Sequence, residues 1–160
     1  MKELNPQIKG TYFLCLFLPS SYFITIGKLG NFCFKKGFYL YTGKAFGYGG
    51  LYARIKRHIK KNTIKRWHID YLKEKSIIQY FGIIANKDIE CKIAQILLKK
   101  FSPVKRFGCS DCKCISHLFY SEDREEFIKC IKKAGISPAL FYINWYFFRF
   151  CFLFLWYLYC

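Results

Sequence analysis

The chain has 160 residues, of which 53% are hydrophobic, so it suits one domain of ordinary size and is not a disordered tail. Its formal net charge is +17, from 27 Lys and Arg against 10 Asp and Glu. A charge this large on a small domain favours a polyanionic partner, either nucleic acid or an acidic membrane surface.

The charge is unevenly spread along the chain. From Lys28 to Arg66 there are eleven basic residues and no acid. A lysine-rich genome would explain lysine in general, but not this local absence of acids. The nine cysteines are odd in number and several lie in apolar strand or helix patterns. We therefore expect free thiols and a reducing cytoplasm rather than a disulfide framework.

The N-terminal part of the chain predicts an antiparallel sheet from Gly10 to Gly43. Residues 9–18 form a strongly apolar run that suits a central, buried strand. Residues 22–26 and 32–34 flank a turn that contains two glycines, which predicts a hairpin. Residues 38–42 predict a further strand.

A basic helix is expected after the glycine-rich turn at residues 47–50. Leu51, Ile55 and Ile59 form its apolar stripe at 100° per residue. Arg54 and His58 lie four residues apart at the border of that stripe, so both should face the seam between helix and sheet. An arginine at such a seam needs a partner. No nearby acid supplies one, and a ligand phosphate could.

The second half of the chain predicts alternating helices and strands. They are a short helix at 66–72, a strand at 76–85, a helix at 88–100, a loop at 108–117, a strand at 118–120 and a last helix that ends near Gly135. In the helix at 88–100, Glu90 falls at the edge of the apolar face and Asp88 on the far side. Glu90 is therefore the acid that should turn inward.

These elements predict an α/β (α+β) fold, with a small, largely antiparallel central sheet flanked by helices, over residues 8–136. Residues 137–160 differ in kind. From residue 139 onward the only charge is Arg149, and twelve residues are aromatic. The length suits a membrane span. An accessory hydrophobic helix, or a tail outside any domain, fits the unusual composition equally well.

The residues that carry chemistry come from neighbouring strands and the basic helix. Tyr12 and Tyr41 lie on strands expected to be adjacent, so their phenols can converge. A phenol beside cationic groups has a lowered pKa and can take a proton from water. Alone, these would be core tyrosines. The combination with Lys44, Arg54 and His58 is far more specific.

These motifs resemble those of the GIY-YIG endonuclease superfamily, and in particular its Uri-type branch. The matching residues are Gly10-Thr11-Tyr12, Tyr41-Thr42-Gly43-Lys44, Arg54, His58 and Glu90. Three further features are similar to the Uri-type branch. They are the hairpin between the two tyrosine motifs, the segment 67–72 and the segment 108–120. The resemblance covers roughly residues 9–120.

The resemblance implies a GIY-YIG-like fold and a metal-dependent endonuclease that hydrolyses phosphodiester bonds, with DNA favoured over RNA as substrate. Glu90 would hold one divalent cation, expected to be Mg²⁺, which stabilises the leaving oxygen. Arg54 would neutralise charge on the phosphate. Lys44 would hold a phosphate or the nucleophile. Many members have an asparagine after the metal glutamate, and residues 101–104 contain none, so one phosphate contact is unassigned.

By the same resemblance, Tyr12 would be the base, helped by His58 or Tyr41. Candidate substrate-binding residues near the site are Arg57, His68, Ser110 and Asp111. His68 could touch phosphate or simply pair with Asp70.

The loop at 108–117 offers three thiols and an imidazole, which are zinc ligands by type. The candidate ligands are Cys109, Cys112, Cys114 and His117. Their spacing is too tight for a usual zinc finger, and no second distant pair exists. A structural or substrate-facing loop is the alternative.

Two other classes of function stay open at this point. A nucleic-acid-binding module could keep the same scaffold without cutting. A membrane-surface protein, tethered through residues 139–160, rests only on the charge and the hydrophobic tail. Presence of the full set of tyrosines, arginine, histidine and glutamate favours catalysis.

Overall fold

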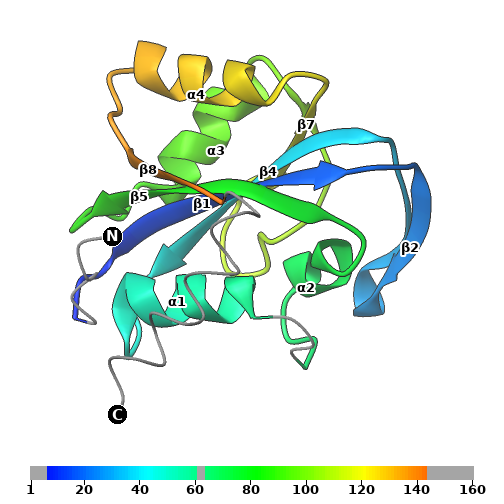
Figure 1. The fold of residues 1–160 in the computed structure, drawn as a ribbon, viewed down its shortest axis with the longest axis horizontal. Coiled ribbons are helices and arrows are strands. Elements are labelled where there is room, and N and C mark those ends of the chain that lie inside the picture. The colour runs from blue at the N-terminus through cyan, green and yellow to red at the C-terminus, as the bar shows by residue number, and fades with distance from the viewer. Residues whose placement is uncertain (1–6, 61–63, 144–160) are drawn as a thin grey trace.

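A six-stranded antiparallel sheet forms the centre of the computed structural model, which describes residues 7–60 and 64–143 (Figure 1). Its strand order is β6-β7-β4-β1-β5-β8. In chain order these strands are β1 (Gly10–Leu18), β4 (Gly37–Ala45), β5 (Ile77–Ala85), β6 (Ser102–Pro103), β7 (Leu118–Ser121) and β8 (Ala139–Tyr142). The predicted mixed α/β fold and the central position of the first strand are confirmed.

Helices cover both faces of this sheet. One face carries α1 (Gly50–Ile59) and α2 (His68–Lys73), and the other carries α3 (Glu90–Leu98) and α4 (Arg124–Lys133) (Figure 1). Each face has its own apolar core, because alternate residues of a strand point to opposite sides. Tyr12 and Tyr41 belong to the core under α1, and Phe13 to the core under α3.

The hairpin after β1 does not join the large sheet, which corrects the expectation of one sheet from Gly10 to Gly43. Within the described part of the chain, its strands β2 (Tyr22–Ile26) and β3 (Gly30–Phe34) pair only with each other, across the short 3₁₀ turn η1 (Gly27–Leu29). The reason is that β1 and β4 pair directly along their whole length, from Gly10–Ala45 to Leu18–Gly37. The hairpin is therefore an insertion between two central strands.

The helix predicted from Asp88 begins at Glu90. Ile89 has a non-helical backbone, and its N–H donates to the side-chain oxygen of Thr11 at 3.0 Å. Thr11 thus fixes where α3 starts. Asp88 is exposed, whereas only 6% of Glu90 is exposed, so the prediction that Glu90 turns inward is confirmed.

The hydrophobic C-terminal segment, expected to be separate from residue 137 onward, begins with a strand of the large sheet. Residues Ala139–Tyr142 form β8 and pair with β5. The membrane span considered for residues 139–160 falls mostly on residues 144–160, which lie outside the described residues. Among the residues that are described, no helix is both long and apolar enough to cross a membrane.

Two glycines set the packing around β1. Tyr12 lies opposite Gly43 of β4, and Phe13 lies opposite Gly82 of β5. A Cβ on Gly43 would come within 2.5 Å of the Tyr12 ring, and a Cβ on Gly82 would collide with the Phe13 ring. Neighbouring aromatic residues of β1 therefore each lie over a glycine, on opposite faces of the sheet.

We expect Gly82→Ala to lower the free energy of unfolding by about 1–3 kcal/mol, because Phe13 must leave its position in a fully packed core. Urea unfolding would measure the change. Gly47→Ala is the matched control, since no atom outside Gly47 and its two chain neighbours lies within 4 Å of its Cβ position. That variant should stay within about 0.5 kcal/mol of wild type. Equal losses in both variants would contradict the role assigned to Gly82.

Candidate active site

Tyr12 and His58 form a buried pair between β1 and α1. The Tyr12 hydroxyl and His58 Nε2 are 2.9 Å apart, and both side chains are almost fully buried. The Tyr41 ring completes the group, with its centroid 6.5 Å from that of Tyr12 and 6.4 Å from that of His58. The predicted convergence of the two tyrosines with the histidine of the basic helix is thus observed.

The phenols in this group correct one expectation of the sequence analysis, namely that nearby cations lower their pKa. Burial raises the pKa of Tyr12 above its ordinary value, and the opposing charge of Arg54 is not enough to reverse it. Burial also raises the pKa of Tyr41, with further contributions from Tyr12 and Glu90. A buried phenolate loses its hydration, and the attraction of one guanidinium does not compensate for that loss. Both tyrosines are therefore neutral phenols at neutral pH.

His58 is held in its neutral form. Burial and the neighbouring positive charge of Lys73 lower the pKa of His58 to about 3. Its Nδ1 is buried with no hydrogen-bond partner among the described residues. A neutral imidazole 2.9 Å from a phenol can accept a hydrogen bond from it.

Arg54 lies against an aromatic ring and has no carboxylate partner. Its guanidinium carbon is 4.3 Å from the centre of the Trp67 ring, and that of Arg57 is 4.1 Å from the same ring. Arg57 also makes two hydrogen bonds of 2.9 Å to the carboxylate of Asp70. Within residues 7–60 and 64–143, no acid forms an ion pair with Arg54. The seam arginine is therefore positioned by Trp67 and remains able to receive an anion.

Arg57, a candidate for substrate binding, forms an ion pair with Asp70 through two hydrogen bonds. Burial acts to raise the pKa of Asp70, but hydrogen bonds from Arg57 and from the backbone N–H groups of Arg66 and Trp67 outweigh it and hold the pKa low. Asp70 therefore does not pair with His68, which was one of the two alternatives for that histidine. The ion pair ties α1 to the start of α2.

Glu90 lies in a second group of polar residues at the start of α3. Its Oε1 is 2.9 Å from Nδ1 of the buried His117, and its Oε2 is 3.9 Å from the Lys44 ammonium. Lys44 also pairs with Asp111 at 3.2 Å, and this contact raises the pKa of Lys44. Asp111 and Ser110 are both exposed. Of these two loop candidates, Asp111 therefore contacts the predicted site through Lys44.

Thr11 and Gly10 join β1, which carries Tyr12, to neighbouring segments of the chain, although the sequence analysis gave them no role. The Thr11 hydroxyl donates to the Lys87 carbonyl at 2.8 Å and accepts from the Ile89 N–H. These bonds hold the chain just before Glu90. A Cβ on Gly10 would collide with the Ile84 carbonyl, so only glycine permits this close contact of β1 with β5.

The loop at 108–117 is fixed to the tyrosine group by its two ends. Gly108 has a φ of +71°, and a Cβ there would approach the Tyr41 ring to 2.8 Å. Its N–H donates to His68 Nδ1 at 3.1 Å. At the other end, the His117 carbonyl accepts from the Thr42 N–H at 2.9 Å. His68 is therefore adjacent to the site, as expected, and orients the loop.

The four predicted zinc ligands are only partly brought together. Sulfur and nitrogen atoms of Cys91, Cys112, Cys114 and His117 lie within 4.8 Å of one another and could hold a metal ion. Cys109 is not among them, because its thiol donates to the Ile115 carbonyl. Cys91 of α3 takes its place. One feature of the sequence could have pointed to Cys91, because it directly follows Glu90, a residue already predicted to lie at the site.

The residues predicted for catalysis thus form two groups, one around Tyr12 and one around Glu90. No direct hydrogen bond joins the two groups in the part of the chain that is described. The negative charge of Glu90 nevertheless acts on both phenols and raises their pKa. The two groups are also neighbours in the sheet, because Thr11 pairs with Lys44 one residue from the pairing of Tyr12 with Gly43.

The neutral state of His58 predicts how stability depends on pH. The unfolded chain binds a proton at His58 near pH 6.5, whereas the folded chain does not until about pH 3. The free energy of unfolding should therefore fall as the pH drops below about 6.5, by up to about 1.4 kcal/mol per pH unit from this residue. Urea unfolding of wild type and His58→Gln, from about pH 7 to pH 5, would measure the difference in slope.

His58→Gln keeps a polar partner for Tyr12 but does not titrate, so its stability should fall less steeply on acidification. Subtraction of the two curves removes the contributions of the other histidines and of the general charge. Parallel curves would contradict the assignment of a neutral, buried His58.

Comparisons with known proteins place the chain in a family. Searches of curated proteins and of solved structures gave no significant match. A family model described as "Domain of unknown function DUF123" matches residues 11–138, which is 128 of the 160 residues. This stretch contains the tyrosine group, Glu90 and the cysteine cluster. The chain therefore belongs to the DUF123 family.

Proposed function

We propose that the protein is a metal-dependent endonuclease of the GIY-YIG type, similar to the Uri-type branch, that hydrolyses phosphodiester bonds in nucleic acid. The single observation that carries this proposal is Arg54. Its guanidinium is held against Trp67, next to the Tyr12–His58 pair, with no carboxylate partner among the described residues. A partly buried cation in this position is suited to a phosphate group.

Lys44 supports phosphate binding from the other group. Its side chain is 39% exposed, and its ammonium lies between Glu90 and the exposed Asp111. An exposed ion pair such as Lys44–Asp111 contributes little to stability, so an incoming phosphate can replace the aspartate at small cost. Lys44 would then contact a substrate phosphate beside Glu90, and Asp111 would be released toward solvent.

Tyr12 and His58 support activation of a water molecule. The Tyr12 phenol is neutral, so it must lose its proton before it can accept one from water. The neutral His58, 2.9 Å away, is the acceptor. In the proposed reaction, Tyr12 passes its proton to His58 as it takes one from the attacking water. This transfer requires the negative charge of the bound phosphate to raise the low pKa of His58.

Glu90 fits the requirements for a divalent cation of the Mg²⁺ class. Its carboxylate is buried, and among the described residues its Oε2 accepts no hydrogen bond and lies 3.9 Å from the Lys44 ammonium. Mg²⁺ is usually bound by one or two carboxylates together with substrate phosphate and water. Such an ion would supply charge stabilisation for the leaving oxygen. His117 fixes the orientation of the carboxylate through Oε1.

The proposed substrate is DNA, in a reducing compartment such as the cytoplasm. The net charge of +17 supports a nucleic-acid partner, and the seven cysteines within the described residues are all free. Cleavage of RNA, or binding without cleavage on the same scaffold, are outcomes that the experiments below distinguish.

Glu90→Gln should reduce Mg²⁺-dependent cleavage by at least about 100-fold, since the amide keeps the size of the side chain but loses the charge that binds the cation. The assay would use duplex, branched and single-stranded DNA of the same sequence, with RNA as a further substrate. Glu126→Gln is the matched control, because Glu126 also lies in the first turn of a helix but pairs with Lys100 on the surface. Equal cutting by all three proteins would exclude the proposed metal site.

Arg54→Ala should lower cleavage by about 10²–10³-fold, because the charge that develops on the phosphate loses its partner. Arg66→Ala, an exposed arginine, is the control and should lower binding only slightly. DNA binding is measured for each protein at several salt concentrations, since the slope reports the number of phosphates contacted. Tight binding by wild type with no cleavage on any substrate would instead indicate a binding module.

A further inference from the structure

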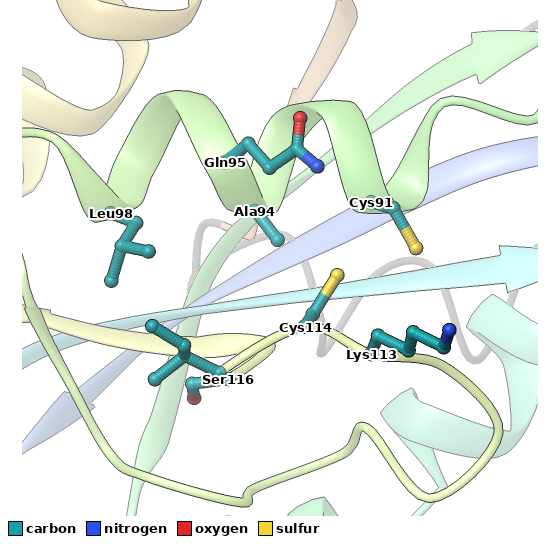
Figure 2. A pocket seen from close by; sticks show the side chains of 8 residues that line it. Cys91, Ala94, Gln95, Leu98, Lys113, Cys114 and Ser116 are labelled. Atoms are coloured by element: carbon teal, nitrogen blue, oxygen red, sulfur yellow. The ribbon is translucent and has the colours of Figure 1, made fainter.

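A group of cysteines with no role in the proposed reaction lies at the junction between α3 and the loop at 108–117. A hollow of about 270 Å³ separates the two, and Cys91 and Cys114 line it from opposite sides. Figure 2 shows the sulfur atoms of these two residues pointing toward each other across it. None of the residues proposed for catalysis lines this hollow.

We infer that Cys91, Cys112, Cys114 and His117 form a Zn²⁺ site that fastens the loop to the start of α3. Three thiols and one imidazole are a common ligand set for structural zinc. Their ligand atoms lie within 4.8 Å of one another. In a tetrahedral site with Zn–S bonds of about 2.3 Å, neighbouring sulfur atoms are roughly 3.8 Å apart. The ligands therefore need to move by about an ångström at most.

His117 has the orientation that such a site requires. Its Nδ1 is 2.9 Å from Glu90 Oε1, and a carboxylate can only accept, so Nδ1 carries the hydrogen. The lone pair of Nε2 then points toward the cysteine cluster, where it is 3.3 Å from Cys112 Sγ. A histidine that donates one nitrogen to a carboxylate and offers the other to a metal is a recurrent arrangement in zinc proteins.

The position of the ligands along the chain explains why the loop alone did not identify the site. Cys112 and Cys114 are two residues apart and His117 follows three residues later, so they supply one compact half. Cys91 supplies the distant ligand, because it lies in the first turn of α3 and faces the loop. All three thiols are half-buried, and His117 is fully buried. The cluster is thus reachable by an ion but largely shielded from water.

This inference does not depend on the nuclease proposal, since it concerns a separate ion held by sulfur and nitrogen. The Mg²⁺ class of ion expected at Glu90 prefers oxygen ligands. Loss of cleavage without loss of zinc, or the reverse, would therefore separate failure of one proposal from failure of the other.

The test begins with the metal content of the full chain, purified under reducing conditions after growth with added Zn²⁺. Wild type should contain about one equivalent of zinc. Cys91→Ser and Cys112→Ser should lose most of it. Cys109→Ser is the matched control, because that thiol lies in the same loop but outside the cluster, and it should retain the zinc.

A second measurement needs no variant, so it remains informative if the cysteine variants fail to fold. In wild type loaded with Zn²⁺, alkylation followed by mass spectrometry should find Cys91, Cys112 and Cys114 protected and Cys109 modified. A zinc-selective chelator should expose the three protected thiols and lower the melting temperature. Replacement by Co²⁺ should give the absorption bands of a tetrahedral thiolate site.

Three results would overturn the inference. The first is wild type without stoichiometric metal after growth and reconstitution with Zn²⁺. The second is equal loss of zinc from Cys109→Ser and Cys91→Ser. The third is a disulfide between two of the cluster cysteines in protein purified with reductant.

Discussion

The structure depends on the packing of three consecutive residues at the start of β1. Tyr12 lies over Gly43 on one face of the sheet and Phe13 lies over Gly82 on the other, so the register with both neighbouring strands is fixed by contact. Thr11, one residue earlier, bonds to the segment that precedes α3. One short stretch of strand therefore positions the phenol beside α1 and the carboxylate at the start of α3. A shift of the register by one residue would turn the aromatic side chains to the wrong faces and separate these two groups.

Few acidic residues lie near β1, so the basic residues around it, Lys44, Arg54 and Arg57, have different partners. Asp70 and Glu90 are the buried carboxylates among the described residues. The Asp70 carboxylate accepts hydrogen bonds from Arg57 and from two backbone N–H groups. It therefore holds α1 against α2. Glu90 is oriented by His117 and only loosely approached by Lys44. Arg54 consequently remains with an aromatic ring as its partner. Two arginines three residues apart thus differ because Asp70 is the single buried carboxylate among the described residues on their side of the sheet.

Much of the fold could be predicted from the sequence because its signals are local. Alternating and continuous apolar runs indicated the strands, and the 100° periodicity placed His58 at the seam between helix and sheet and Glu90 at the edge of an apolar helix face. What could not be predicted depended on contacts between distant residues. The separation of β2 and β3 from the large sheet follows from direct pairing of β1 with β4. The raised pKa of Tyr12 follows from how completely the core closes over it, which no charge count reveals. Cys91 joined the cysteine cluster only because α3 begins beside the loop.

His117 links the two parts of the protein that carry chemistry, and its environment decides what each can do. Its backbone carbonyl is bound by the Thr42 N–H, next to Tyr41, and its ring is fully buried. Nδ1 faces Glu90 and Nε2 faces Cys112, so the His117 ring lies between the cysteine cluster and the hydrogen bond that orients the Glu90 carboxylate. A metal bound to Nε2 would fix the tautomer with hydrogen on Nδ1 and so keep Glu90 as an acceptor. The cysteine-rich loop, which contains no proposed catalytic residue, would in this way determine the geometry of the carboxylate on which the proposed chemistry depends.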